Sequence, residues 1–263
     1  MERHLWIVSM IFDLQKASIW KRASAFLFDF ILFGILAVGF AFLLSEITGY
    51  DNYSTTYSYK LTEYEQAYST SFNYTEDEFN ALGKEEQTAY MNARNALFED
   101  LNAMYAYNMV VNLILLITSI SICLAYLVLE FIIPILFKNG QTLGKKIFGI
   151  AIMRTNGVKM NNVSLFIRTF LGKYAIETMV PVLILVMIFF NMIGLTGTIV
   201  IGLLLLLQII LFCATKRNSL IHDLLADTVV VDFASQMIYD TEEDLIEAKK
   251  KAAAEKVNKA SYY

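Results

Sequence analysis

The sequence predicts an all-α membrane protein with four transmembrane helices, an extracytoplasmic helical insert and a small cytoplasmic β-sheet. Three observations predict this fold class. Hydrophobic residues make up 57% of the 263 residues and charged residues 17%, a balance that is rare in soluble domains. Four apolar stretches, at 25–44, 110–137, 174–192 and 197–213, approach or reach the roughly 20 residues that a spanning helix needs. The polar segments between these stretches also differ in the sign of their charge.

The charges of the polar segments predict the orientation. Segment 138–173 contains seven Lys or Arg residues and no acid, whereas segment 49–108 contains ten acids and three bases. Short basic loops stay on the cytoplasmic side of a membrane, so we expect both termini in the cytoplasm and segment 49–108 outside. A single span in place of the last two would put Lys216 and Arg217 outside, so four spans fit the rule better.

The N-terminal region predicts an interfacial helix at 1–24, because an apolar and aromatic stretch at 5–12 lies among basic residues. The first span follows at 25–48. It is too long for the apolar core of a signal peptide and carries Asp29, so we expect it to be retained.

The insert at 49–108 is acidic and rich in tyrosine. Segment 49–75 has no clear period, which predicts an irregular cap or a partly mobile segment. From Glu76 onward apolar residues recur near every 3.6 positions, which predicts an amphipathic helix with Gly83 as its weakest point. We expect this helix to run straight into the second span at 109–137 and to pack on the insert itself or on an outside partner.

The basic cytoplasmic loop at 138–173 predicts a β-hairpin, because Asn156 and Gly157 lie between two apolar runs and tolerate positive φ. A hairpin alone is marginally stable, so we expect the distant strand at 228–232 to complete a small sheet. The remaining predicted segments are spans at 174–193 and 197–214, a short helix and strand within 215–232, and a charged tail at 233–263.

No cofactor and no metal site is expected. The two cysteines, Cys123 and Cys213, lie in apolar stretches, and the two histidines form no ligand motif. No enzyme motif is present in the sequence, and the net charge of −4 gives no case for nucleic acid. The expected partners are membrane lipid, a monovalent cation or proton, and a homo-oligomer or membrane partner protein.

Three motifs carry a resemblance to a known family: KRASAFLFD at 21–29, GQTLGKK at 140–146 and SLIHDLLADTVVV at 219–231. On these motifs the chain resembles the RDD family of bacterial integral membrane proteins over 21–44 and 110–232. The resemblance identifies Arg22, Asp29 and Asp223 as the family's arginine and two aspartates. It implies a multi-pass protein of the bacterial plasma membrane that transports a ligand or exchanges sodium for protons. Asp227 departs from the family, which usually has a small residue there, often glycine.

Charged side chains inside a membrane are costly, so the acids there are the leading functional candidates. Asp29, Glu130 and Glu177 lie at comparable predicted depth and could converge on one polar cavity that binds an ion. Alternatively, Arg168 or Lys173 neutralises Glu177 in an ordinary salt bridge.

Arg22 lies seven residues before Asp29, about 10 Å along a helix axis, which is too far for a direct pair. We expect Arg22 to reach Asp223 or Asp227, which are four residues apart and share a helix face. Two functions follow. The first is a small secondary transporter or cation/proton exchanger, an oligomer, with ion-binding candidates Asp29, Glu130, Glu177 and Asp227. The alternative is a non-transporting accessory or scaffold protein, with a structural Arg–Asp cluster and an acidic insert that binds a partner.

Overall fold

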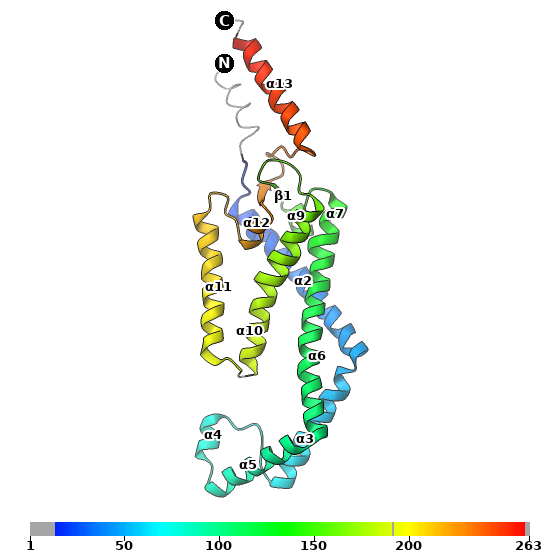
Figure 1. Ribbon diagram of the computed structural model, residues 1–263, viewed down its shortest axis with the longest axis vertical. Helices are drawn as coiled ribbons and strands as arrows, with labels where there is room; N and C mark the ends of the chain where they lie inside the picture. Colours follow the sequence, from blue (N-terminus) through cyan, green and yellow to red (C-terminus); the bar gives the residue numbers. More distant parts are fainter. Residues whose placement is uncertain (1–13, 191, 261–263) are drawn as a thin grey trace. The chain divides into compact units, whose positions relative to one another are not determined.

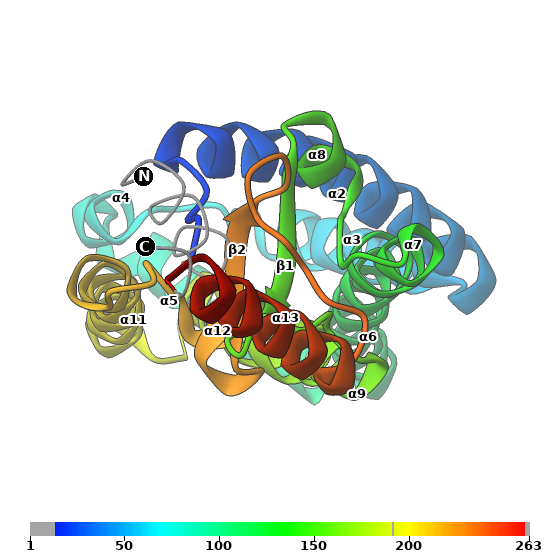
Figure 2. The same cartoon turned by 90° about the horizontal axis from the view of Figure 1, so that it is seen from above.

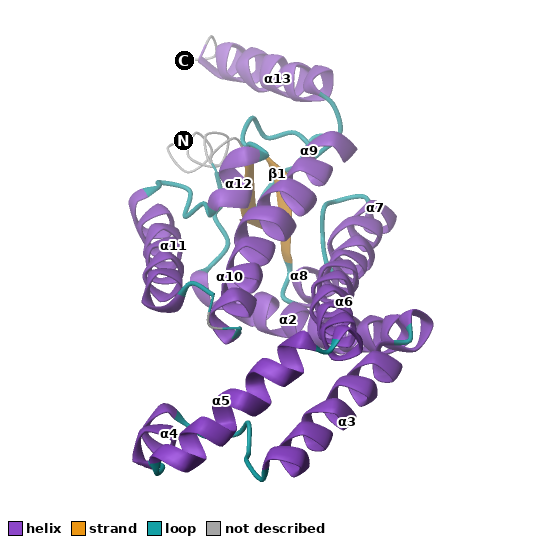
Figure 3. Cartoon of the chain, turned by 60° about the horizontal axis from the view of Figure 1, so that its bottom comes forward, coloured by secondary structure: helices purple, strands orange, loops and turns teal. Residues whose placement is uncertain are grey.

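The computed structural model describes residues 14–190 and 192–260, which form two compact units. The first unit contains the described residues up to Ala37 and from Ile122 onward, and the second is Val38–Ser121. Helices dominate both units, and the described strands are β1 (Ile150–Arg154) and β2 (Thr228–Asp232) (Figure 1). Figure 3 shows the helices in purple and the strands in orange.

Four helices are long and apolar enough to cross a membrane, as the sequence predicts. The first is α2 (Ile19–Thr48) and the fourth is α11 (Gly194–Ala214). The second, Leu101–Phe137, joins α6 (Leu101–Tyr126), η1 (Leu127–Ile132) and α7 (Ile133–Phe137). The third, Asn162–Phe189, joins α9 (Asn162–Phe166), η2 (Ile167–Met179) and α10 (Val180–Phe189).

Each of these helices begins earlier than its apolar stretch indicates, and in the first and third the added turns carry charged residues. The first begins at Ile19, so Arg22 lies on the first long helix itself. The third begins at Asn162, so Arg168 and Lys173 lie on this helix and not in the preceding loop. Their charges lower the local hydropathy without ending the helix. A helix of 30 residues is about 45 Å long, whereas the hydrocarbon core of a bilayer is about 30 Å thick. The charged turns can therefore lie near one end of each helix.

The segments η1 and η2 are π-helical, with wider turns than an α-helix. Each ends two residues before a proline, Pro134 or Pro181. Proline lacks an N–H and leaves the carbonyl four residues earlier without its α-helical donor. The freed carbonyl of Glu130 accepts a hydrogen bond from Thr169 Oγ1 at 2.9 Å, which ties the second long helix to the third.

The small sheet has two antiparallel strands that are far apart in sequence, with Ile150 opposite Asp232 and Arg154 opposite Thr228. β1 and β2 lie side by side in Figure 2. Lys16, just before α2, forms a single bridge with Val231. The expected distant strand is thus present.

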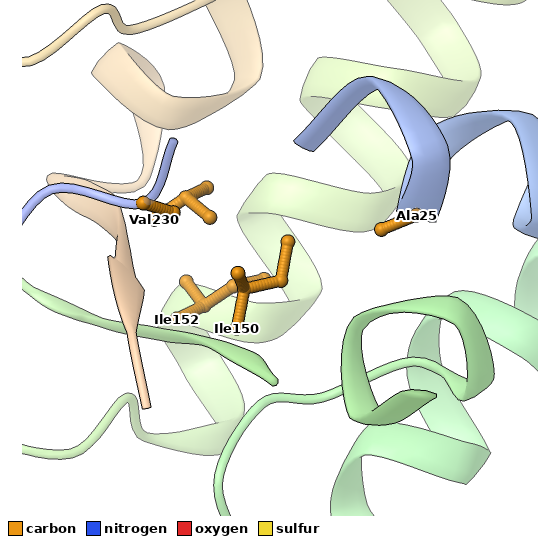
Figure 4. Packing of buried hydrophobic residues seen from close by; sticks show 5 residues of the cluster. Ala25, Ile150, Ile152 and Val230 are labelled. Carbon is orange, nitrogen blue, oxygen red and sulfur yellow. The ribbon is translucent and has the colours of Figure 1, made fainter. Parts of the chain in front are cut away.

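Buried apolar residues cover both faces of the sheet. On one face, a cluster joins the sheet to α2 (Figure 4); it contains Ala17, Ala25, Ile150, Ile152 and Val230. The other face carries a second cluster of Ala151, Met153, Val229 and Val231. This double coverage explains how two short strands are stable next to the membrane helices.

The predicted β-hairpin is wrong in part. Asn156 and Gly157 do form a tight turn, in which the Arg154 N–H donates to the Val158 carbonyl at 2.8 Å. In the described structure the returning chain makes one bridge to β1, Met153 to Lys159, and Asn161 then caps α9. β2 fills the position beside β1 that a longer hairpin would need.

Three shorter helices complete the first unit: α8 (Leu143–Ile147), α12 (Ile221–Leu225) and α13 (Glu242–Ala260). The first 13 residues of the interfacial helix predicted at 1–24 lie outside the described residues. Of the remainder, residues 19–24 belong to α2, and Lys16 pairs with β2 instead of lying in a helix.

The second unit contains α3 (Tyr50–Tyr68), α4 (Glu76–Ala81) and α5 (Lys84–Glu99). The irregular cap predicted at 49–75 is wrong, because most of it is α3. The helix expected from Glu76 is interrupted at Gly83, its predicted weakest point, and again at Asp100, which has an extended backbone. The expectation that it runs straight into the second span is therefore wrong. Asp100 accepts hydrogen bonds from the N–H groups of Asn102 and Ala103 and so caps α6.

Candidate functional site

The Asp29 carboxylate of α2 binds the start of α8 through both oxygens. Its Oδ1 accepts a hydrogen bond from the Gly144 N–H at 2.7 Å, and its Oδ2 accepts one from the Thr142 hydroxyl at 2.5 Å. The Lys145 ammonium lies 3.7 Å from the same Oδ2. The GQTLGKK motif therefore supplies the partners of Asp29.

Gly144 allows this contact because it has no side chain. A Cβ at this position would lie 2.4 Å from the Ala25 carbonyl oxygen and 2.9 Å from the Asp29 carboxylate. A Cβ atom essentially never lies this close to a non-bonded atom, so any other residue at position 144 would push α8 away from α2.

Glu130 of η1 shares Lys145 with Asp29. Lys145 Nζ lies 3.8 Å from Glu130 Oε2 and 3.0 Å from the Thr142 hydroxyl, while Lys173 of η2 pairs with the other Glu130 oxygen. We call Asp29, Glu130, Lys145 and Lys173 the acid–lysine cluster. Burial lowers the pKa of Lys145 to about 8, because the loss of hydration outweighs the attraction of Glu130 and Asp29.

Asp223 of α12 lies between two arginines. Arg168 of η2 donates to its Oδ1 from Nη2 at 2.7 Å and from Nε at 3.2 Å, and Arg22 Nη2 lies 3.7 Å from its Oδ2. The side chains of Arg168 and Asp223 are 2% and 1% exposed. Burial alone would raise the pKa of Asp223, but Arg168 and its neighbours hold that pKa well below its usual range. We call Arg22, Arg168 and Asp223 the arginine–aspartate cluster.

Glu177 of η2 pairs with His222 of α12. Its carboxylate accepts from the His222 N–H at 3.0 Å and lies 2.7 Å from His222 Nδ1. The two helices meet at Gly172, where a Cβ would lie 2.5 Å from the His222 Cβ. Burial lowers the pKa of His222, so the ring is neutral at pH 7 and its Nδ1–H donates to Glu177.

The structure therefore separates the three acids that the sequence suggests could converge. Asp29 and Glu130 meet at Lys145, but Glu177 belongs to a different pair. Arg168 and Lys173 do not bind Glu177; they bind Asp223 and Glu130.

Asp227 lies apart from both clusters. α12 ends at Leu225, so Asp227 does not share a helix face with Asp223, and the expectation that it would is wrong. Its side chain is 62% exposed, accepts a hydrogen bond from Thr155 at 2.6 Å and lies 3.9 Å from Arg217. Its φ of 49° lies in the left-handed region, which glycine tolerates best and aspartate tolerates better than most residues.

The buried and half-buried charges on the long helices and on the two elements facing them sum to zero. The set contains four acids and four bases: Asp29, Glu130, Glu177 and Asp223, and Arg22, Lys145, Arg168 and Lys173. These charges are not matched pair by pair, because Glu177 contacts the neutral His222 and Asp223 contacts two arginines. Among the residues that the structure describes, no three His, Cys, Asp or Glu side chains are grouped to hold a metal. The acid–lysine cluster, with two acids and two bases, can bind a further cation only by exchanging it for a charge that is already present.

We did not identify Thr142, Gly144 and Lys145 from the sequence as partners of Asp29. We also overlooked a repeated glutamate–proline spacing in the second and third long helices. Both intramembrane glutamates are followed by a proline at the fourth position, in EFIIP at 130–134 and ETMVP at 177–181. This repeated pattern marks the two π-helical segments, which contain Glu130, Arg168, Lys173 and Glu177.

Comparison with known proteins gives one match. The family model described as "RDD family" matches residues 16–227, a range that contains both clusters. No curated protein and no solved structure matches the chain. Together with the four long apolar helices, the family match indicates a multi-pass membrane protein.

Proposed function

This chain belongs to the RDD family, and we propose that it exchanges a monovalent cation for a proton across the membrane. In this proposal Asp29 and Glu130 are the cation-binding carboxylates. Lys145 is the group that releases the proton.

The position of the Lys145 ammonium is the observation that supports this function. Nζ lies within 4 Å of the Thr142 hydroxyl, the Asp29 carboxylate and the Glu130 carboxylate, which come from three different elements. Carboxylate and hydroxyl oxygens are also the ligands that hard cations prefer. The ammonium thus occupies a place that suits a monovalent cation.

The charge of the cluster favours exchange over simple binding. Two acids and two lysines give the acid–lysine cluster a net charge of zero. A metal cation added to it would carry a positive charge that no acid of the cluster balances. If Lys145 loses its proton, the cluster has one unmatched negative charge, and a monovalent cation restores neutrality. The pKa of about 8 makes this loss accessible near neutral pH. One proton would then leave for each cation that binds.

The arginine–aspartate cluster has a positioning role in this proposal. It ties α2, η2 and α12 together through Arg22, Arg168 and Asp223. Because the Lys145 site is built from α2, η1 and α8, the position of α2 affects both clusters. Four spans are few for an exchanger that acts alone, so we expect an oligomer.

The proposal is tested by proton movement in liposomes under an inward sodium or potassium gradient. We expect flux from wild type and little from Asp29→Asn or Glu130→Gln. The control is Asp227→Asn, which also removes one carboxylate but outside the cluster, and it should retain flux. A wild-type protein that is folded in the liposomes but moves no protons under either gradient contradicts the proposal.

A second candidate is the non-transporting accessory protein. The pairing of Asp29, Glu130 and Asp223 with lysines and arginines favours it, since such a charge network can be purely structural. In that case wild type gives no flux, and Asp29→Asn changes only stability. The acidic second unit or the tail would then bind the partner.

A further inference from the structure

A cavity in the first unit lies apart from both charge clusters. It has a volume of about 200 Å³ and lies between the end of α7 and the start of α9. Its polar lining includes Lys138, Lys159 and Asn162, and its apolar lining includes Pro134, Ile135 and Leu165.

The cavity has a positive charge that is only partly compensated. Lys138 makes no ion pair with any acid in the described part of the chain. Lys159 Nζ lies 3.1 Å from Asp240, whose side chain is 78% exposed. The segment 138–173 that supplies both lysines contains no acid of its own. An anion that enters the cavity therefore meets two lysines and competes with one exposed carboxylate.

The apolar wall of the cavity belongs to two candidate membrane spans. Pro134 and Ile135 are in the last turns of Leu101–Phe137, and Leu165 is in the first turn of Asn162–Phe189. The neighbouring Leu136 is 69% exposed, which suits contact with acyl chains. The cavity thus lies where a span ends, at the level of lipid headgroups, with lysines on the polar side and an apolar surface on the other.

We propose that this cavity binds the headgroup phosphate of an anionic phospholipid. Basic pockets between membrane helices bind anionic headgroups, because the phosphate pairs with Lys or Arg while the acyl chains remain in the bilayer. A free phosphate would use the lysines but gain nothing from the apolar wall. The site is independent of the cation exchange proposed above, since neither lysine belongs to the acid–lysine cluster.

The test is native mass spectrometry of the purified full-length chain with phosphatidylglycerol or phosphatidylcholine of the same acyl chains. We expect wild type to retain phosphatidylglycerol preferentially. The double variant Lys138→Gln/Lys159→Gln should bind it about tenfold or more weakly. The control Lys250→Gln/Lys251→Gln also removes two exposed lysines, but from α13, and should bind as wild type does.

Three results would overturn the proposal. They are equal retention of the two lipids by wild type, equal loss in the cavity variant and the α13 control, and displacement of phosphatidylglycerol by inorganic phosphate at an equal concentration. The last result would mean a simple anion site. Both lysines are at least partly exposed, so we expect the double variant to fold, and circular dichroism checks this. The single variant Lys138→Gln repeats the lipid-binding test with a smaller change.

Discussion

The Asp29 carboxylate and the Gly144 backbone N–H form a 2.7 Å hydrogen bond between residues that are 115 positions apart. This contact joins the first long helix to α8, which follows the second, and it places Lys145 next to both Asp29 and Glu130. The acid on α2 is therefore sheltered from lipid by a polar backbone group, a hydroxyl and an ammonium. Its 8% exposure agrees with this shelter.

Gly144→Ala should destabilise the protein by about 1–3 kcal/mol, the usual cost of overpacking a tight contact. The added methyl would lie 2.4 Å from the Ala25 carbonyl oxygen, so α8 must move away and the Asp29 hydrogen bonds must lengthen. Thermal unfolding in detergent measures the loss. Gly34→Ala is the matched control on α2, because a Cβ there meets no atom within 4 Å, and it should be neutral or slightly stabilising. Equal stability of the two variants would contradict the close packing.

Arg168→Gln should cost more stability than Arg22→Gln. Arg168 makes two hydrogen bonds to Asp223, whereas Arg22 approaches only to 3.7 Å. Removing one member of a buried pair leaves a charge without its partner, which costs about 3–5 kcal/mol. We expect about this loss for Arg168 and a smaller one for Arg22, measured by thermal unfolding. The opposite ranking would mean that Arg22 is the main partner of Asp223.

Exchange should be fastest near pH 8 and slower on either side. Below this pH Lys145 stays protonated and fills the site, whereas well above it the neutral amine leaves the carboxylates to a cation but has no proton to exchange. Lys145→Arg should abolish the pH-dependent activity, because a guanidinium stays charged at all relevant pH values. The liposome assay repeated across a pH series measures this profile.

The matched control for Lys145→Arg is Lys146→Arg. The ammonium of the neighbouring Lys146 lies over the Phe137 ring, 3.8 Å from its centroid, and the Lys146 side chain makes no ion pair with the cluster in the described structure. Its variant should keep the wild-type profile. A Lys145→Arg protein with unchanged exchange at every pH would remove Lys145 from the mechanism.

Asp100→Ala should destabilise the second unit by about 1–2 kcal/mol, since Asp100 caps α6. It also binds Lys60 at 3.0 Å and Tyr64 at 3.2 Å, both on α3. Hydrogen exchange measured by mass spectrometry should show faster exchange in α3 and at the start of α6. Glu99→Ala removes the preceding exposed acid and should leave exchange unchanged. The same protection pattern in both variants would contradict the capping role.

The sequence predicts the four long helices and the two strands, at 150–154 and 228–232, because these features leave local signals; that the two strands pair directly with each other depends on the fold. Apolar length marks a span, and a short β-branched run marks a buried strand. The start of the third helix leaves no such signal, since Arg168 and Lys173 interrupt the apolar pattern and their partners, Asp223 and Glu130, are distant in sequence. Likewise α3 has too weak a period among its tyrosines to be recognised.

The candidate site is predictable only in part for the same reason. The motif containing Thr142, Gly144 and Lys145 is visible in the sequence. Only the fold shows that these three residues bind the Asp29 carboxylate. The π-helical segments add a second obstacle. Arg168 and Lys173 are five residues apart, a spacing that aligns on a π-helix and not on a helix of 3.6 residues per turn.

Calorimetric titration of the purified protein with sodium at pH 7 and pH 9 tests the exchange mechanism most directly. Repeating each titration in buffers of different ionisation enthalpy counts the protons released as the cation binds. We predict tighter sodium binding at pH 9, and at pH 7 the release of about one proton per sodium ion, lost in Lys145→Arg. Sodium binding of equal strength at both pH values with no proton release, or no binding at pH 9, would contradict the mechanism.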